Sequence, residues 1–259
     1  MKSVATYMNT VDHEIIAHPA ERVFRAVCLE KPCFIKKHVP CKRNFFHKLQ
    51  GFLFKITHNP LLAITILGQE KSQTSFEGHK LIELKQLGIN VPNVLACTDD
   101  YLVIEDCGRS LTEVIKGDPQ NSQLYLEKAI AALARLHRLK QCHGGAQIRN
   151  FTLKEDRIYL IDFEEYIPEE YFNDLAFRDL LLFLMSASAV LGHVQSIPRL
   201  IQIYEENSRL PVRKRLLRLA RRLRFLNLFT RKPLVKWMGK DVLTMQRLME
   251  AIRGQLEAA

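Results

Sequence analysis

The chain has 259 residues, of which 47% are hydrophobic and 25% are charged, enough to bury one substantial core or two modest lobes. It shows no N-terminal signal segment, and its longest apolar runs, 60–67 and 180–192, are shorter than the roughly 18 residues that cross a bilayer. The six cysteines are scattered without a C-x-x-C pair. This pattern argues against a zinc site or a disulfide framework and favours a reducing, cytoplasmic compartment.

The positive charge is concentrated near the C-terminus. Residues 1–212 hold 25 Lys/Arg and 25 Asp/Glu, whereas residues 213–240 hold eleven Lys/Arg and no acidic residue. A second acid-free stretch, 31–69, carries seven Lys/Arg. Localised positive charge binds polyanions, so we expect 213–240 to bind an anionic membrane surface, an anionic glycolipid or nucleic acid. The alternative is a helix packed on the protein with its arginines in solvent.

The predicted elements change from strands to helices along the chain. Residues 13–39 are rich in β-formers and predict strands around 14–17 and 27–37, and a basic insert follows at 38–70. Ser75 is expected to begin a helix that Gly88 ends. Further strands are predicted at 93–97, 101–105 and 157–162, and helices at 124–139, 174–192, 197–206 and 212–226.

This order predicts an α+β fold of two lobes. The N-terminal lobe, residues 1–106, would be rich in strands and would carry the basic insert. The C-terminal lobe, residues 107–259, would be helical and would carry the basic segment 213–240. The lobes would join near residues 106–108.

Four features along this order are suited to phosphoryl transfer, which depends on positioning and on stabilising negative charge. Lys36 ends a strand and would neutralise the phosphates of a nucleotide. Glu77, on the next helix, would pair with that lysine and fix its direction. Asn150, in a loop, and Asp162, at the end of a strand, offer the hard oxygen ligands that magnesium prefers. The sequence therefore predicts a site for ATP and Mg²⁺.

The same segments resemble a known superfamily. Leu136-His137, His143-Gly144 with Asn150, and the run Ile161-Asp162-Phe163-Glu164 resemble the catalytic and metal-binding segments of protein-kinase-like proteins. The Asp-Phe-Glu variant is similar to that of aminoglycoside and choline phosphotransferases. Residues 77–95 and 102–105 resemble lipopolysaccharide core (Kdo/heptose) kinases and the small atypical kinase of the KEOPS complex. The basic insert also resembles that of the lipopolysaccharide kinases.

The resemblance implies roles for further residues. The catalytic loop would contain His143, Gly145, Gln147 and Asn150. Glu105 and Cys107 would lie at the hinge and contribute to cofactor binding.

The resemblance also implies that Asp179 braces the catalytic loop. The histidine pairs His137/His143 and His137/Cys142 could suggest a metal site, and Cys142 beside His143 a nucleophile. Packing roles within the loop are the simpler interpretation.

Two departures from the family pattern concern catalysis. Residues 14–33 contain no glycine, so the usual flexible cover over the phosphates is missing. Gly145 stands where the family has its general-base aspartate, and loss of such a base typically costs about 10²–10⁴-fold in rate. Gln147 could position a hydroxyl but cannot accept its proton.

The sequence therefore predicts a phosphotransferase that uses ATP and magnesium, resembles lipopolysaccharide kinases and acts on a hydroxyl of a membrane-attached glycan from the cytoplasmic side. The first alternative is a nucleotide-binding pseudokinase that holds a protein partner, favoured by Gly145. The second is an RNA-linked kinase or ATPase of the KEOPS type, whose basic tail would contact tRNA.

Overall fold

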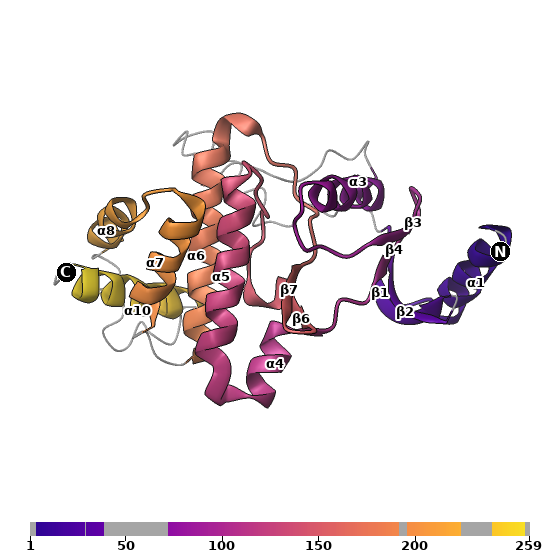
Figure 1. The fold of residues 1–259 in the computed structure, drawn as a ribbon, viewed down its shortest axis with the longest axis horizontal. Helices are drawn as coiled ribbons and strands as arrows, with labels where there is room; N and C mark the ends of the chain where they lie inside the picture. Colours follow the sequence, from indigo (N-terminus) through magenta and orange to yellow (C-terminus); the bar gives the residue numbers. More distant parts are fainter. Residues whose placement is uncertain (1–3, 29, 39–71, 192–195, 224–239, 257–259) are drawn as a thin grey trace. The chain divides into compact units, whose positions relative to one another are not determined.

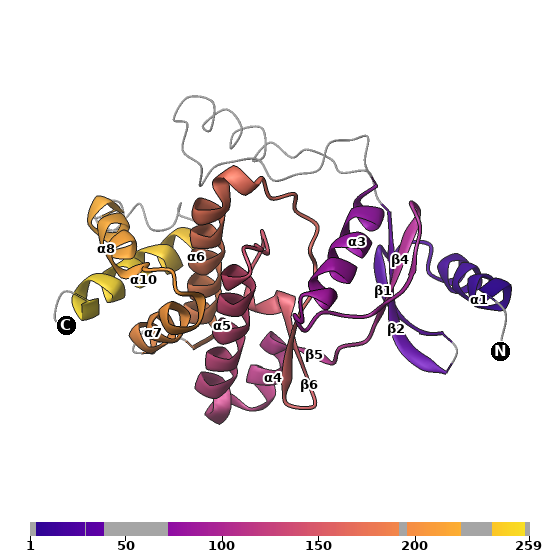
Figure 2. The same ribbon diagram turned by 45° about the horizontal axis from the view of Figure 1, so that its top comes forward.

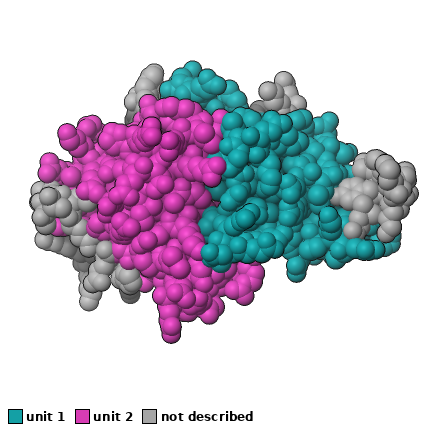
Figure 3. Space-filling view, in the orientation of Figure 1, with its two compact units in different colours: residues 1–108, 152–171 teal, residues 109–151, 172–259 magenta. Residues whose placement is uncertain are grey.

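The computed structural model describes residues 4–28, 30–38, 72–191, 196–223 and 240–256. The chain divides into two compact units, residues 1–108 with 152–171 (unit 1) and residues 109–151 with 172–259 (unit 2), coloured separately in Figure 3. The α+β fold predicted from the sequence is confirmed, with an antiparallel sheet in the N-terminal part and mostly helices in the C-terminal part.

The helices and strands of unit 1 are α1 (Val4–Ala17), β1 (Val23–Cys28), β2 (Lys31–Lys37), α3 (Gln73–Gln86), β3 (Val94–Cys97), β4 (Tyr101–Glu105), β7 (Arg157–Leu160) and a 3₁₀ turn at Glu169–Tyr171. Those of unit 2 are β5 (Arg109–Ser110), α4 (Leu111–Gly117), α5 (Ser122–Arg138), α6 (Phe172–Leu191), α7 (Ile197–Ser208), α8 (Arg213–Arg222), α10 (Lys240–Leu256) and 3₁₀ turns at Pro119–Asn121 and Ile148–Asn150. Strand β6 (Phe151–Lys154) begins at the boundary.

The main sheet of unit 1 has the strand order β1-β2-β4-β3, and all neighbouring pairs are antiparallel. Side chains alternate between its faces. Phe24 and Ile35 belong to a buried cluster that includes Val11 of α1. Helix α3 contacts β3 and β4, and Figures 1 and 2 show the two helices on opposite sides of the sheet. The sheet therefore presents alternate residues of one strand to two different helices.

The prediction of a strand at 14–17 was wrong, because these residues end helix α1. Val11 is fully buried and Ile15, one helical turn later, is half-buried against the same cluster. That four-residue spacing places both side chains on one helix face. The short β-forming run Glu14–Ala17 was too local a signal to reveal the longer helical period.

Helix α3 starts earlier than expected. Its N-cap is Ser72, whose side chain accepts a hydrogen bond from the backbone N–H of Ser75, so Ser75 lies inside the helix and is not its cap. The predicted end is confirmed, since the helix stops at Gln86 and Gly88 adopts a φ of 75°. Glycine tolerates this left-handed backbone at little cost.

Strands β6 and β7 are neighbours in their sheet, and the turn between them has positive φ at both Glu155 and Asp156, as in a two-residue hairpin turn. Most of this hairpin, with the segment after it, belongs to unit 1, whereas we expected it in the C-terminal lobe. One reason is visible in the backbone, because the N–H of Leu160 donates to the carbonyl of Asn90 at 3.0 Å. The boundary between the units, after Gly108, lies two residues from the predicted division.

Unit 2 is built of helices whose apolar residues recur every three or four positions. On α5 the buried set includes Leu126, Ile130 and Leu133, a stripe that faces the core of an amphipathic helix. Helix α5 packs on α6 and α7, and α10 packs on α6, α7 and α8. The four helices predicted for this part of the chain correspond to α5, α6, α7 and α8, whereas α4 and α10 here, and α1 in unit 1, were missed.

Two predicted features lie outside the described residues: the basic insert 38–70, apart from His38, and residues 224–239 of the basic segment 213–240. Among the described helices, none is long and apolar enough to cross a membrane.

Candidate functional site

The centre of the candidate site in unit 1 is the ammonium group of Lys36. Lys36 lies on β2 between Ile35 and Lys37, and the alternation of the strand sends neighbours to opposite faces. Lys36 points toward α3 and is only 6% exposed. Lys37 instead contacts the α1 side, where its Nζ lies over the ring of Phe24 and donates to the carbonyl of His18.

Helix α3 supplies the predicted partner of this lysine. Glu77 Oε2 accepts from Lys36 Nζ at 2.7 Å, and the glutamate is only 1% exposed. The prediction that Lys36 and Glu77 pair is confirmed by this contact. This ion pair fixes the direction of the long, flexible lysine side chain, because the backbone of Lys36 lies in strand β2 and its ammonium group is held by a buried carboxylate.

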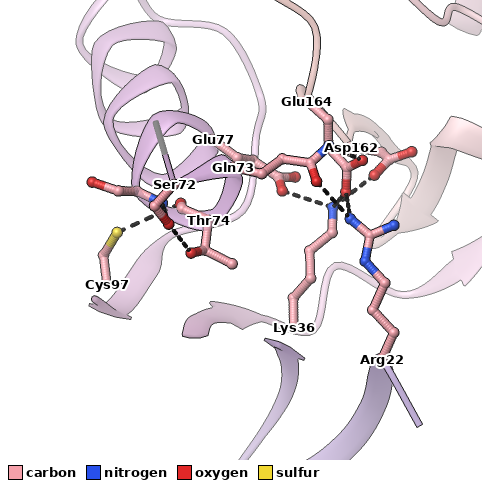
Figure 4. Close-up of polar contacts among 10 residues, drawn as sticks. Arg22, Lys36, Ser72, Gln73, Thr74, Glu77, Cys97, Asp162 and Glu164 are labelled. Carbon is pink, nitrogen blue, oxygen red and sulfur yellow. Dashed lines mark hydrogen bonds and ion pairs between the residues drawn. The ribbon is translucent and has the colours of Figure 1, made fainter. Parts of the chain in front are cut away.

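Two more carboxylates converge on the same ammonium, as Figure 4 shows. Asp162 Oδ1 lies 2.7 Å and Glu164 Oε1 lies 2.5 Å from Lys36 Nζ. Glu164 is also held by Arg22 at 2.6 Å and by the side-chain amide of Gln73 at 2.8 Å. The side chain of Asp162, in contrast, remains 43% exposed. Asp162 is therefore the carboxylate of this cluster most open to a ligand.

The backbone at Asp162 is in the left-handed region, with φ of 71°. Aspartate adopts this conformation more often than most residues, yet it still costs of order 1 kcal/mol and tends to occur at functional sites. Asp162 is the second residue after strand β7, so the end of that strand determines where this carboxylate lies.

One ammonium shared by three carboxylates affects the acids and the base differently. Burial alone would lower the pKa of Lys36, but the charges of Glu77, Asp162 and Glu164 outweigh burial and raise that pKa. Burial raises the pKa of Glu77 to about 7, and the attraction of Lys36 only partly opposes it. Lys36 is therefore a permanent cation, and the pKa of the most buried carboxyl of the cluster lies close to neutral pH.

The donors of this cluster fit a hard divalent cation. Carboxylate oxygens of Glu77, Asp162 and Glu164 lie within 4.8 Å of one another, and oxygen donors are the ligands that magnesium prefers. Within the described residues, Glu77 Oε1 is buried and has no hydrogen-bond partner. Buried polar atoms are rarely left unsatisfied, so an orphaned oxygen here is a place where a ligand or water belongs.

Unit 2 holds the predicted catalytic loop in a buried network. Asp179 of α6 accepts from the backbone N–H groups of His143 at 2.7 Å and Gly144 at 3.1 Å. Its Oδ2 also lies 3.4 Å from Nε2 of His137, whose Nδ1 is 2.6 Å from the hydroxyl of Tyr204. Asp179 thus braces the loop, as the family resemblance implied.

The charged form of Asp179 is favoured despite its complete burial. Burial alone would raise its pKa, but the hydrogen bond and charge of His137, with the charge of His143 and the N–H of Gly144, hold that pKa below its ordinary value. The carboxylate is therefore ionised at neutral pH, which strengthens each hydrogen bond that it accepts.

The remaining loop residues are arranged around Gly145. Its carbonyl accepts from the side chain of Asn150 at 2.8 Å and from the N–H of Gln147 at 2.7 Å. The glycine of this loop with positive φ, 89°, is Gly144 and not Gly145. Asn150 belongs to unit 2 and Asp162 to unit 1, and their shared metal site stays a prediction.

The hinge residues occupy well-defined places in unit 1. The carboxylate of Glu105 accepts from Lys154 at 2.8 Å and from Asn93 at 2.5 Å, and the hydrogen bond from Lys154 is the main cause that lowers its pKa. Cys107 is buried, which raises the pKa of its thiol to about 12. These contacts hold both side chains in place within unit 1, and cofactor binding by the two residues stays a prediction.

The buried histidine alternative has a structural explanation. Ligand atoms of His137, Cys142 and Asp179 lie within 4.8 Å of one another, but both ring nitrogens of His137 already lie within hydrogen-bonding distance of Tyr204 and Asp179. Cys142 Sγ contacts the carbonyl of Phe172 at 3.8 Å. This set is a packed core, in agreement with the packing role expected from the sequence.

Sequence reasoning did not assign site roles to Glu164, Arg22 and Gln73. Glu164 lies two positions after Asp162, and a second carboxylate so close to a predicted metal ligand could have indicated a larger acidic cluster. Arg22 and Gln73 carry no comparable signal, because each meets Glu164 through a contact between segments far apart in the sequence.

The chain is similar to known proteins over much of its length. Residues 23–180, more than half of the chain, match the family model described as the RIO domain. An uncharacterized protein of Haemophilus influenzae is 28% identical over 131 residues, which are 49% of this chain and 54% of that protein. The chain therefore spans about half the length of the curated relative it matches. Among solved structures, WaaP in complex with acyl carrier protein has a TM-score of 0.47 and 16% identity, covering 89% of this chain and 84% of that chain.

Proposed function

The chain belongs to the RIO domain family, and on this premise we propose that it is a phosphotransferase that uses ATP and magnesium. That family lies within the atypical part of the protein-kinase-like superfamily that the sequence resembles. The observation that carries the proposal is the Lys36–Glu77 ion pair with the exposed carboxylate of Asp162 beside it. These side chains come from a strand, a helix and a loop far apart in the sequence. Their convergence provides a buried cation and oxygen donors at one point.

Each of these residues has a distinct chemical role. Lys36 is a fixed cation that would neutralise nucleotide phosphates. Glu77 holds its direction from the core. Asp162, with Asn150 as its predicted companion, would hold magnesium. When bound, the metal ion would supply neutralising charge at the phosphates.

The loop in unit 2 lacks a side chain that could take a proton at position 145. Gly145 contributes its carbonyl to the structure of the loop, and Gln147 offers an amide that orients but does not accept a proton. We therefore expect turnover to be slow, by about 10²–10⁴-fold relative to a loop with a general base. This position also favours the second candidate, a pseudokinase that binds nucleotide without turnover.

The proposed acceptor is a hydroxyl of an anionic, membrane-attached glycan, and the basic helix α8 supports it. Leu216 is buried on the protein side of this helix. Lys214, Arg218 and Arg222 follow one another at four-residue spacing and are exposed, which places them in one stripe. Among the described residues these three cations have no ion-pair partner, so they are available to a polyanion.

Consumption of ATP tests the proposal. We would compare wild type, Asp162→Ala and Gly145→Asp, each with and without a bacterial lipid and glycan extract. The proposal predicts slow turnover that Asp162→Ala abolishes. Gly145→Asp should raise the rate, because aspartate supplies a general base and Gly145 is not one of the glycines with positive φ, where a side chain would be strained. Turnover unchanged by Asp162→Ala would disprove the site. Nucleotide binding without turnover in any arm would establish the pseudokinase.

A further inference from the structure

Unit 2 contains a cavity that none of the roles above explains. It measures about 600 Å³, within the range of small-molecule sites. One wall is the loop segment Gln147–Arg149, and α4 contributes Thr112. The facing wall is α6, from which Leu182, Met185, Ala189 and Val190 line the cavity. The predicted catalytic loop thus forms part of a hollow that has one polar and one apolar side.

The wall next to the loop is held in place. Ser186 Oγ accepts from the backbone N–H of Ile148 at 3.0 Å and donates to the carbonyl of Phe183 at 2.9 Å. This hydroxyl ties the loop to α6, and both of its hydrogen bonds are internal. The loop wall of the cavity is therefore held against α6 by hydrogen bonds within the protein.

Three polar side chains of the lining form no side-chain hydrogen bond or ion pair in the part of the chain that the structure describes. They are the guanidinium of Arg149, the amide of Gln147 and the hydroxyl of Thr112. Arginine binds a carboxylate or phosphate through two parallel hydrogen bonds. An amide and a hydroxyl suit the hydroxyl groups of a ligand.

We propose that this cavity binds the acceptor substrate, and that the part of the acceptor inside the cavity is amphiphilic, with an apolar portion and one acidic group. The acidic group pairs with Arg149, a hydroxyl lies at Gln147, and the apolar part of the molecule covers Met185 and Val190. This inference rests on the proposed phosphotransferase function, since an acceptor must lie beside the catalytic loop. It narrows the acceptor from any anionic glycan to one that presents an apolar portion next to an acidic group.

Two fluorescent probes with the same aromatic body separate the charge from the apolar contact. 8-Anilinonaphthalene-1-sulfonate carries one acidic group, and N-phenyl-1-naphthylamine carries none. Arg149→Gln should weaken binding of the sulfonate about tenfold, as expected for one charge-assisted contact, and leave the neutral probe within about twofold. Arg135→Gln, an exposed arginine on α5 away from the cavity, is the matched control and should change neither. Equal effects of the two substitutions would overturn the assignment of Arg149.

Filling the cavity tests its location. Ala189 lines the cavity and is exposed, so Ala189→Trp can occupy the space without disturbing the core. It should weaken both probes at least about tenfold, and unchanged binding of both would place the probes elsewhere and refute the site.

Kinetics then test the assignment to the acceptor. The sulfonate should inhibit transfer competitively with a bacterial glycolipid extract, whereas inhibition that excess extract does not relieve would contradict the acceptor role. Stabilisation by Mg-ATP is measured alongside. Its absence with intact probe binding would count against the phosphotransferase function and not against the cavity as a binding site.

Discussion

The bracing of the catalytic loop by Asp179 gives a prediction that follows directly from distances. Asp179→Ala would leave the N–H groups of His143 and Gly144 unsatisfied in the core. Each buried, unsatisfied group costs about 1–3 kcal/mol, so we expect the free energy of unfolding to fall by about 3–5 kcal/mol. Asp179→Asn keeps one acceptor oxygen but loses the charge, and should cost about 1–2 kcal/mol.

Urea denaturation followed by far-ultraviolet circular dichroism measures these changes, with the slope on urea expected to stay constant. Asp174→Ala is the matched control on the same helix, because Asp174 makes a partly exposed ion pair with Arg215 and should cost at most about 1 kcal/mol. If Asp179→Ala costs no more than Asp174→Ala, the bracing argument fails. Because the pKa of Asp179 is lowered by folding, its contribution is complete above the unfolded pKa of about 3.9 and is lost as the pH falls below it.

Three further predictions concern unit 1 and α8. Lys36→Ala should weaken ATP binding at least about tenfold and Lys37→Ala less than about twofold, as measured by calorimetry. Equal losses would contradict the claim that the two lysines point to opposite faces of the sheet. Because the pKa of Glu77 is about 7 when folded and about 4.3 in an unfolded chain, stability in metal-free buffer should fall by about 2–3 kcal/mol as the pH rises from 5 to 8. Glu77→Gln should remove that fall, and a variant with the wild-type pH profile would show that another group causes it. Arg218→Glu with Arg222→Glu should release the protein from anionic vesicles in sedimentation while its melting temperature stays within about 3 °C, and equal wild-type binding to neutral vesicles would refute the electrostatic account.

The sequence predicted those parts of the site that depend on local order. The strand period of two around Lys36 and the helix carrying Glu77 are short-range signals, and their roles followed from charge chemistry. The family resemblance also predicted the role of Asp179, and the structure shows its contacts with the loop. Residues whose function depends on a motif or on one element were thus within reach.

Long-range packing explains what was missed. Glu164 and Arg22 meet although 142 residues separate them, and no local pattern carries that information. The helix at α1 was mistaken for a strand because the β-forming run Glu14–Ala17 outweighed the four-residue spacing of Val11 and Ile15. The N-cap at Ser72 was displaced to Ser75 because both are serines, and only the hydrogen bond between them distinguishes cap from first turn.

The central claim is that Asp162, beside the Lys36–Glu77 pair, holds the metal of a bound nucleotide. Thermal denaturation of wild type, Asp162→Ala and the exposed control Asp100→Ala, each with ATP in magnesium or in EDTA, tests it most directly. At about 100 times the dissociation constant, Mg-ATP should add about 2.7 kcal/mol of stability to wild type and to Asp100→Ala. Asp162→Ala should lose the dependence on magnesium. A wild type that millimolar Mg-ATP does not stabilise, or an Asp162→Ala variant that keeps the full magnesium effect, would contradict the account.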